Sequence, residues 1–491
     1  IGNGNTLENY RIYGNSVQNG TPTPDSPVEI ESVGNKTDNL IDYNQFTPYT
    51  AGGMTFINNG IQYTGSYYMA ITLNNLISGS TYIMSFDMES TDEINPYWRF
   101  KYTDNTYSSA ARGGVSMTIP EDKTVESILL YPEISPTIHT TKITNIQLLQ
   151  GNTVKSYEPY GKYKIPVTVS SKNLLNINRE PSDSYNLSTK KYINGGAASN
   201  MFCHPAKTVI EILNNKLKVE SKEGGYGAGY IVEVKPNTSY TISFETNKES
   251  SGTYAGLNLI SDSEKLGTYT TMNSKTHTIT TQNNTKYLYI VFRFPPKDGT
   301  VEYSNIQIEE GSVATKYEPY HEQTTNIYLD EPLRKIGDYA DYIDFREQKV
   351  VRNIKEYTFT GEESFVLFPN TNNFYTLTLE DAKYEPNIKC LSNLYGSNDS
   401  AGGTEYSSGI WVQSTNTYKR LYIANSNYAT VDAFKNNIKT LYETNNPLIV
   451  DYILNSPIEN SIYLEPITTI KGTNIITIPT TINSSNIEIC S

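Results

Sequence analysis

Alternation of apolar and polar residues with a period of two recurs along the chain and predicts β-strands. Residues 239–245, Ser-Tyr-Thr-Ile-Ser-Phe-Glu, place Tyr240, Ile242 and Phe244 on one face, because successive side chains of a strand point to opposite sides. Residues 286–294 continue the pattern over a length that crosses a whole sheet, and we expect their all-apolar side to face inward. Short strands of this kind, separated by turn residues, are typical of a β-sandwich.

One segment has the period of a helix instead. Thr430 is a suitable N-cap, and Phe434, Ile438 and Leu441 then recur at helical spacing until Pro447 rules out continuation. We therefore predict one helix near residues 431–444, inside a β-rich region that spans 331–491.

The sequence contains one unit twice. Asn39-Leu40 is echoed by Asn173-Leu174, and the strand 81–86 is echoed by 239–244. The closing segments match better: Ile-Thr-Asn-Ile-Gln-Leu at 143–148 and Tyr-Glu-Pro-Tyr at 157–160 return as Tyr-Ser-Asn-Ile-Gln-Ile at 303–308 and Tyr-Glu-Pro-Tyr at 317–320. We expect four parts: an N-terminal strand with a Pro-rich linker (1–35), module 1 (36–165), module 2 (166–330) and the C-terminal domain (331–491).

Composition supports an all-β fold and excludes some partners. The 491 residues include 41 Tyr and 32 Gly, which favour strands and tight turns. With 39 basic against 52 acidic side chains and a net charge of −13, the chain lacks the concentrated cations that nucleic acid binding needs. No window approaches the roughly 20 apolar residues of a membrane span, so we expect no membrane insertion.

The three cysteines, Cys203, Cys390 and Cys490, are odd in number and far apart, and we expect free thiols rather than a disulfide framework. The chain starts with Ile rather than Met, and we read it as a processed product or a piece of something longer.

Signatures of catalysis are missing from the sequence. The histidines, His139, His204, His277 and His321, are scattered without a metal-binding or nucleophile motif. Adjacent carboxylates such as Asp92-Glu93 would point to opposite faces of a strand, which is poor geometry for glycoside cleavage. We therefore expect a protein that is not an enzyme.

Residues 15–34, Asn-Ser-Val-Gln-Asn-Gly-Thr-Pro-Thr-Pro-Asp-Ser-Pro-Val-Glu-Ile-Glu-Ser-Val-Gly, resemble a linker of tail and baseplate minor structural proteins of phages, or phage-tail-like particles, of Gram-positive bacteria. In that family the linker introduces modules that begin with Asn-Leu and end near Tyr-Glu-Pro-Tyr. These modules are similar to jelly-roll carbohydrate-binding modules. The C-terminal region, with Tyr-Ala-Asp-Tyr-Ile-Asp-Phe at 339–345, resembles the last module of similar tail proteins.

This resemblance implies the fold, the partners and the location. The fold class would be all-β, with tandem jelly-roll β-sandwiches followed by a β-rich domain that carries one helix. Implied partners are host cell-surface polysaccharide, other tail or baseplate proteins and further copies in a homo-oligomer, and the location would be a virion tail or an extracellular tail-like particle. The chain would act as a receptor-binding adhesin, or alternatively as a purely structural subunit whose sandwiches are spacers or docking surfaces. A structural calcium ion is also implied, without assignable ligands.

The segment Thr-Pro-Thr-Pro-Asp-Ser-Pro at 21–27 has three prolines in seven residues, which favours an extended conformation. It is either a stiff arm that holds module 1 away from its anchor or a loop packed along the edge of a domain.

Sugar binding requires an aromatic face for the C–H patch of a pyranose and polar side chains for its hydroxyls. In module 1, residues 97–102 combine these types, and on a strand Tyr97 and Arg99 would share one face while Trp98 lies on the other. We expect Trp98 in the core, which leaves Tyr97 and Arg99 as ligand candidates.

Further candidates are Tyr226, Tyr230 and Tyr254 in module 2 and Trp411 in the C-terminal domain. The three tyrosines lie in Gly-rich or polar surroundings and would line a shallow groove, or they would simply cover sheet surface. Trp411 has the same two interpretations. Exposure of these rings decides between an adhesin and a spacer.

Overall fold

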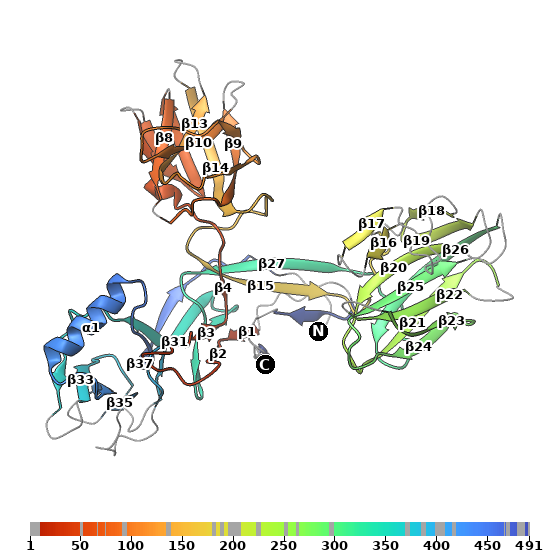
Figure 1. The fold of residues 1–491 in the computed structure, drawn as a ribbon. Helices are drawn as coiled ribbons and strands as arrows, with labels where there is room; N and C mark the ends of the chain where they lie inside the picture. The colour runs from red at the N-terminus through yellow and green to blue at the C-terminus, as the bar shows by residue number, and fades with distance from the viewer. Residues whose placement is uncertain are drawn as a thin grey trace.

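Two β-sandwiches and a third domain make up the chain, and every pair of named strands is antiparallel (Figure 1). The computed structural model describes residues 10–49, 53–65, 67–73, 75–90, 96–133, 139–178, 183–186, 191–194, 208–221, 227–249, 254–261, 265–293, 299–368, 374–383, 389–397, 408–414, 419–465, 467, 472–478 and 487–489. The all-β class with a single helix near the C-terminus, as the sequence predicts, is confirmed in this part of the chain.

Module 1 is a sandwich of two five-stranded sheets. Sheet A contains, in spatial order, β11 (Ala111–Arg112), β10 (Tyr97–Tyr102), β13 (Val125–Glu133), β8 (Tyr67–Thr72) and β5 (Thr47–Pro48). Sheet B contains β12 (Ser116–Thr118), β9 (Thr81–Ser90), β14 (His139–Gln150), β7 (Gly60–Gly65) and β6 (Gly53–Ile57). A 3₁₀ turn, η2 (Tyr43–Gln45), precedes β5. Large rings such as Trp98, Phe100 and Tyr63 fill the space between the sheets.

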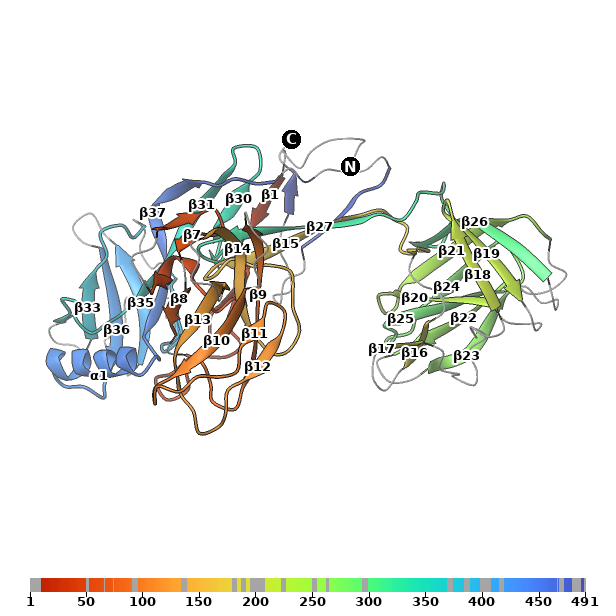
Figure 2. The same cartoon turned by 90° about the horizontal axis from the view of Figure 1, so that it is seen from above.

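Module 2 has the same two-layer plan and stands apart from the rest of the molecule (Figure 2). One sheet contains β20 (Gly227–Glu233), β25 (Tyr287–Arg293), β22 (Ala255–Ile260) and β23 (Lys265–Met272). The other contains β18 (Thr208–Leu213), β19 (Lys216–Ser221), β26 (Gly299–Glu310), β21 (Ser239–Thr246) and β24 (Thr276–Thr280), and a hairpin is formed by β16 (Asp183–Asn186) and β17 (Lys191–Asn194).

The two strands that the sequence predicts at 239–245 and 286–294 are present in module 2 as β21 and β25. Tyr240, Ile242 and Phe244 of β21 are buried in its core, as predicted. Leu288 and Ile290, on the inward side of β25, are fully buried in the same core.

The third domain, here called the framework domain, is built from both ends of the chain. Its main sheet contains β34 (Leu391–Ser392), β37 (Ile449–Ser461), β31 (Lys349–Thr358), β30 (Tyr342–Asp344), β1 (Tyr10–Tyr13) and β39 (Ile487–Ile489). A second sheet contains β32 (Val366–Leu367), β33 (Phe374–Thr378), β36 (Lys419–Asn425) and β35 (Ser408–Ser414). Short hairpins pair β2 (Ser16–Val17) with β3 (Glu31–Ser32) and β28 (Lys335–Ile336) with β29 (Tyr339–Ala340).

A ribbon joins the framework domain to module 2 (Figure 1). It contains β27 (Glu322–Leu329), β15 (Tyr163–Ser170) and β38 (Ile475–Thr477), with β4 (Asn35–Lys36) beside the start of β15. Because β15 and β27 pair along their whole length, the segments that join the modules are structured strands rather than free linkers. Module 1 is thus inserted between β4 and β15, and module 2 between β15 and β27.

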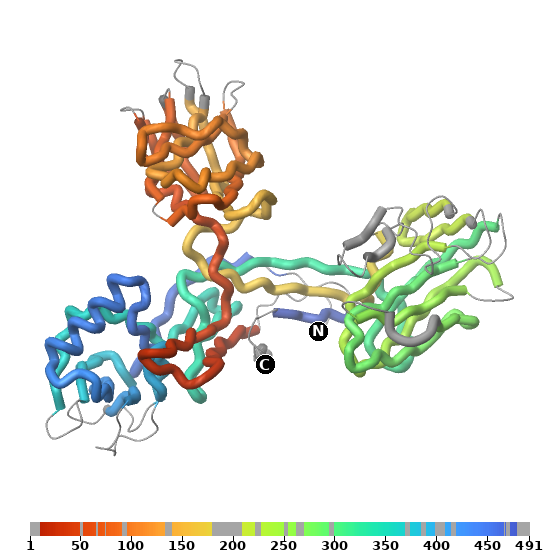
Figure 3. Tube along the Cα trace, in the orientation of Figure 1, coloured from red at the N-terminus to blue at the C-terminus, as the bar shows by residue number. Residues whose placement is uncertain are grey.

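The Pro-rich segment is a loop packed on the framework domain, so of its two interpretations the packed loop is the one observed. Thr23 and Ser26 form a tight turn. The backbone N–H of Val28 donates to the carbonyl of Asn393 at 2.9 Å, and Gln18 Nε2 donates to the carbonyl of Ser392 at 2.9 Å. Figure 3 shows this N-terminal stretch of the tube running beside the C-terminal half.

Helix α1 (Val431–Glu443) begins and ends close to the predicted positions. Thr430 Oγ1 accepts a hydrogen bond from the backbone N–H of Ala433 at 3.2 Å. Phe434 and Ile438 are fully buried, and the ring of Phe434 stacks on Tyr375 with centroids 3.9 Å apart. The helix is therefore held by its apolar face against the second sheet of the framework domain.

Thr430→Ala is expected to lower the free energy of unfolding of the framework domain by about 1 kcal/mol, because one N–H of the first turn loses its cap. Urea denaturation of the full chain, followed by circular dichroism, measures this change. Thr440→Ala, on the exposed side of the same helix, is the control and should change stability much less. Equal effects of the two substitutions would contradict a capping role for Thr430.

Candidate functional site

Strand β10 presents Tyr97 and Arg99 on the outer face of sheet A, and this is the face that the sequence assigned to them. Both side chains are partly exposed, while Trp98 between them is fully buried. Trp98 Nε1 donates to the carbonyl of Arg112 at 3.2 Å. Trp98 is therefore a core residue, as expected, and the candidate site lies on the opposite face of the strand.

Tyrosines from four segments join Tyr97 on this face. The Tyr97 ring stacks on Tyr131 of β13, with centroids 4.4 Å apart and planes inclined by 9°. The ring centroid of Tyr131 lies 5.0 Å from that of Tyr68 of β8, and the ring centroid of Tyr68 lies 4.5 Å from that of Tyr49. Tyr67 meets Tyr49 edge to face at 6.0 Å. Together with Tyr107, these residues form a continuous series of aromatic contacts that we call the tyrosine row; Tyr131 in its centre is buried.

Arg99 is the cation of the tyrosine row. Its guanidinium carbon lies 4.4 Å from the ring centroid of Tyr107 and 4.9 Å from that of Tyr131. Nη2 donates to the Tyr131 hydroxyl at 2.5 Å, whereas the buried Nε has no hydrogen-bond partner among the described residues. Contacts with two rings and one hydrogen bond hold the guanidinium in place, so its remaining N–H groups are positioned before any ligand arrives.

The outer members of the row expose their rings. Tyr49 is 60% exposed, Tyr67 49% and Tyr107 47%, which leaves aromatic surface for stacking. Burial raises the pKa of Tyr68 and Tyr97 above the ordinary tyrosine value. Their phenols are therefore neutral at physiological pH and serve both as donors and as acceptors.

Tyr67 has an unusual backbone conformation, with φ of 81°. Its strand has a register shift against β13 between Leu130 and Glu133, which marks a β-bulge. A bulky residue at positive φ costs about 1–3 kcal/mol, and such strain is concentrated at functional sites. The bulge is what turns the Tyr67 ring toward the rest of the row.

The candidates in module 2 do not form a comparable surface. Tyr230 is 4% exposed and its hydroxyl donates to the carbonyl of Ile177, and Tyr254 is 5% exposed with its hydroxyl on Glu249. Both rings belong to the core, so neither exposes a face on which a sugar could stack, although Tyr230 is among the residues that border a cavity of module 2. Polar neighbours in sequence did not keep them at the surface, because their rings fill the space between the sheets. Tyr226 lies outside the described residues.

Trp411 is also buried, which corrects its assignment as an exposed ligand residue. It is 2% exposed and stacks on Tyr422 at 5.2 Å and 4°, with Phe374 packed edge to face against it. Its neighbours Ile410 and Val412 on β35 are buried as well, so this strand is covered on both faces.

The repeated Asn-Leu motif has a structural role. Asn39 Nδ2 donates to the carbonyls of Ile146 and Glu158 at 3.1 and 3.0 Å. Its Oδ1 accepts from the backbone N–H groups of Ile41 and Leu148 at 3.0 and 3.1 Å. One buried side chain therefore joins the first residues of module 1 to its closing strand and to its Tyr-Glu-Pro-Tyr exit.

Asn173 makes the same four bonds in module 2. Its Nδ2 donates to the carbonyls of Ile306 and Glu318, at 2.9 and 3.1 Å. Its Oδ1 accepts from the N–H groups of Leu175 and Ile308, both at 3.1 Å. The most recognisable part of the repeat is thus a clasp that closes each sandwich, and it does not contribute to the tyrosine row.

Metal and membrane signals were searched only in the described residues. No group of three or more His, Cys, Asp or Glu side chains there is arranged to hold a metal ion, so the structural calcium stays a prediction. Cys390 is a free, buried thiol, and Cys203 and Cys490 lie outside the described residues. The one helix described is too short and polar to cross a membrane.

Comparisons with known proteins identify no family. No family model matches the chain, and no curated protein matches it. Among solved structures, the chain is similar to the N-terminal CBM22-1–CBM22-2 tandem domain of Xyn10C from Paenibacillus barcinonensis, at 11% identity. The match covers 56% of this chain and 99% of that one with a TM-score of 0.20, which is too low to support an argument about fold or function.

Five members of the tyrosine row escaped the sequence analysis: Tyr49, Tyr67, Tyr68, Tyr107 and Tyr131. They come from separate segments and meet only through strand pairing, such as Tyr97 opposite Tyr131. A chain with 41 tyrosines gives no local sign of which rings gather on one face. The one available signal was the alternation in β10, which assigned the face of Tyr97 and Arg99 correctly.

Proposed function

We propose that the chain is a non-enzymatic adhesin that binds cell-surface polysaccharide through the tyrosine row of module 1. The observation that carries the proposal is the position of Arg99 against two aromatic rings, on a face where Tyr49, Tyr67 and Tyr107 are 47–60% exposed. Exposed rings accept the C–H face of a sugar, while the guanidinium and the neutral phenols pair with hydroxyls.

A shallow surface of this kind binds each sugar weakly, and several copies on one particle would supply avidity. The resemblance of the sequence to tail proteins supports a place on a phage tail or tail-like particle of a Gram-positive host. Homo-oligomers and contacts with other tail proteins are part of the same proposal.

A structural role is the second candidate, and it applies to module 2. Its candidate rings Tyr230 and Tyr254 are core residues, as expected for a spacer. On this reading, module 2 separates the framework domain from a neighbour and contributes no sugar site.

Cosedimentation of the full chain with isolated Gram-positive cell walls tests the adhesin proposal. We expect binding to intact walls, loss of binding after chemical removal of wall polysaccharide, and at least tenfold weaker binding for Arg99→Ala and Tyr107→Ala. Tenfold corresponds to about 1.4 kcal/mol, which is modest for losing a cation held against two rings.

Two exposed residues of the framework domain provide matched controls. Arg346→Ala removes an exposed arginine, and Tyr442→Ala removes a ring that is 47% exposed, like Tyr107. Both should bind walls as the unmodified chain does. Undiminished binding by Arg99→Ala, or equal binding to stripped walls, would refute the proposal.

A further inference from the structure

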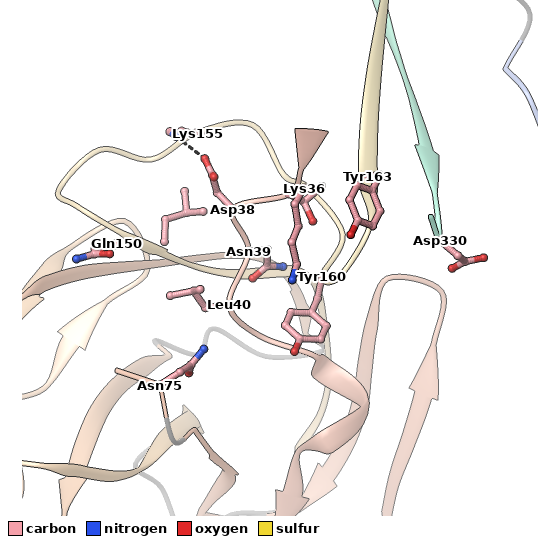
Figure 4. A pocket seen from close by; sticks show the side chains of 13 residues that line it. Lys36, Asp38, Asn39, Leu40, Asn75, Gln150, Lys155, Tyr160, Tyr163 and Asp330 are labelled. Carbon is pink, nitrogen blue, oxygen red and sulfur yellow. Dashed lines mark hydrogen bonds and ion pairs between the residues drawn. The ribbon is translucent and has the colours of Figure 1, made fainter. Parts of the chain in front are cut away.

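A cavity lies where module 1 meets the ribbon, and none of the tyrosine row residues line it. It has a volume of about 710 Å³ and is lined by residues of the module entry, of the end of β14, of the exit loop and of the ribbon. Figure 4 shows Lys36, Asn75, Gln150, Tyr160 and Asp330 arranged around it. We call it the junction cleft. Its size is within the range of sites that hold small ligands, and domain junctions are common places for them.

Two lysines, Lys36 and Lys155, and two aspartates, Asp38 and Asp330, line the junction cleft. Asp38 is paired with Lys155 at 2.7 Å, and Asp330 is paired with Lys162. Lys36 is exposed and has no ionic partner among the described residues. Because Asp330 is paired with Lys162, which is not part of the lining, the cleft holds one ammonium group that is not in an ion pair with any described residue.

The remaining lining suits a carbohydrate. The Tyr160 ring is 45% exposed and borders the cleft, and the amides of Asn75 and Gln150 are exposed in it. In Figure 4 the Lys36 side chain extends toward Tyr160 and Asn39. All four hydrogen bonds of the Asn39 side chain are made within the clasp, so Asn39 is not available to a ligand. Lys36 and Tyr160 supply the charge and the aromatic ring that a ligand could contact.

The corresponding corner of module 2 is acidic and has no lysine among the described residues of its lining. It forms a cavity of about 520 Å³, in which Ser170 takes the place of Lys36 and Tyr320 that of Tyr160. Glu322 replaces Lys162, and the Tyr320 hydroxyl donates to Glu322 at 3.0 Å. Glu233 adds a second carboxylate to that cavity. In the described part of the chain, an ammonium group without an ion pair is therefore present in the corner of module 1, whereas two carboxylates and no cation line the corner of module 2.

We propose that the junction cleft binds an acidic unit of the polysaccharide, with its carboxylate or phosphate on Lys36 and its sugar or polyol body against Tyr160. The proposal rests on the polysaccharide binding proposed above and adds a second contact that recognises charge. A single ammonium group gives millimolar affinity that falls with added salt, because the site is open to solvent.

Saturation-transfer NMR on the full chain, with sodium glucuronate, glycerol 3-phosphate and glucose as probes, tests this inference. We expect transfer to one or both acids that depends on Lys36, and the acid that binds identifies the carboxylate or the phosphate as the ligand group. Transfer to glucose, which the tyrosine row also binds under the proposed function, should be the same in the unmodified chain and in Lys36→Gln. Lys36→Gln should weaken acid binding at least tenfold, whereas Lys36→Arg should retain it. Lys216→Gln, which removes an exposed lysine of module 2, is the control.

Arg99→Ala separates this inference from the proposed function, since Arg99 is a cation too. Acid binding that survives Arg99→Ala and disappears in Lys36→Gln supports the junction cleft, even if wall binding fails. Acid binding that survives Lys36→Gln, or transfer to glucose that falls in Lys36→Gln as much as transfer to the acids, overturns it. Absence of transfer to either acid overturns it as well.

Discussion

Asn39→Ala lowers the free energy of unfolding of module 1 by about 4 kcal/mol, because four hydrogen bonds of a buried side chain are lost together. Asn39 is 3% exposed, and its partners are backbone groups of the first and last segments of the sandwich. Water cannot replace it without opening the module. Asn173→Ala should have the same effect on module 2, where the side chain is 2% exposed.

Differential scanning calorimetry of the full chain measures both effects. Each substitution should move the transition of its own module downward by roughly 15 °C and leave the other module unchanged. Asn44→Ala and Asn178→Ala, which alter exposed asparagines of the same two modules, are the controls. If Asn39→Ala shifts melting no more than Asn44→Ala does, the clasp has no energetic importance.

The framework domain is expected to be more stable at pH 5.5 than at pH 8. Asp451 is 1% exposed, and burial raises its pKa to about 7 from the ordinary value of 3.8. Arg334 Nε is its ionic partner at 3.4 Å, but the same guanidinium donates to Glu331 at 2.6 Å and to Glu356 at 2.8 Å. One cation thus faces three carboxylates, and Asp451 Oδ1 accepts no hydrogen bond.

The sign of the effect follows from linkage. Below pH 4 the carboxyl of Asp451 is protonated in the folded and the unfolded chain, so its ionisation does not affect the free energy of unfolding. Between pH 4 and pH 7 the unfolded chain releases this proton while the folded chain retains it, so stability falls as pH rises. A shift of three pH units corresponds to about 4 kcal/mol at most. Asp341, whose pKa burial also raises, acts in the same direction.

Urea denaturation at pH 5.5 and at pH 8, monitored on the framework domain, measures this difference. Asp451→Asn keeps the shape of the side chain and removes the charge, so the difference in stability between the two pH values should become smaller than in the unmodified chain, with Asp341 accounting for part of what remains. Asp344→Asn is the control: contacts with Arg11 and backbone N–H groups hold the pKa of Asp344 below its usual range, so that group does not titrate in this window. An equal slope in Asp451→Asn and in the unmodified chain would assign the effect to other groups.

Local patterns in the sequence predicted the elements well. The Thr430 cap and the spacing of Phe434 and Ile438 placed the helix, because capping and amphipathic burial act within a few residues. Alternation in β10 and β21 assigned the correct inner faces, since the core of a sandwich accepts one face of each strand. The repeat was visible because both clasps need the same asparagine.

Long-range pairing was not predictable from these patterns. Arg11 lies opposite Asp344 in the main framework sheet, and its Nε donates to Asp344 Oδ2 at 2.8 Å. The sequence around either residue does not indicate that the two strands pair. The same reason explains why Tyr131 and Tyr68 were missed. Trp411 was misjudged because its strand is buried on both faces, a case in which alternation carries no information.

Because both modules are inserted into one framework domain, such chains can evolve by gain, loss or exchange of whole modules. The clasp of module 1 brings its entrance and exit together, and Lys36 lies opposite Tyr163 in the ribbon. A whole module could therefore be deleted, duplicated or exchanged between genomes, and a short turn from β4 to β15 would restore the chain. Such chains would then evolve by replacement of whole modules, while the framework domain stays the same.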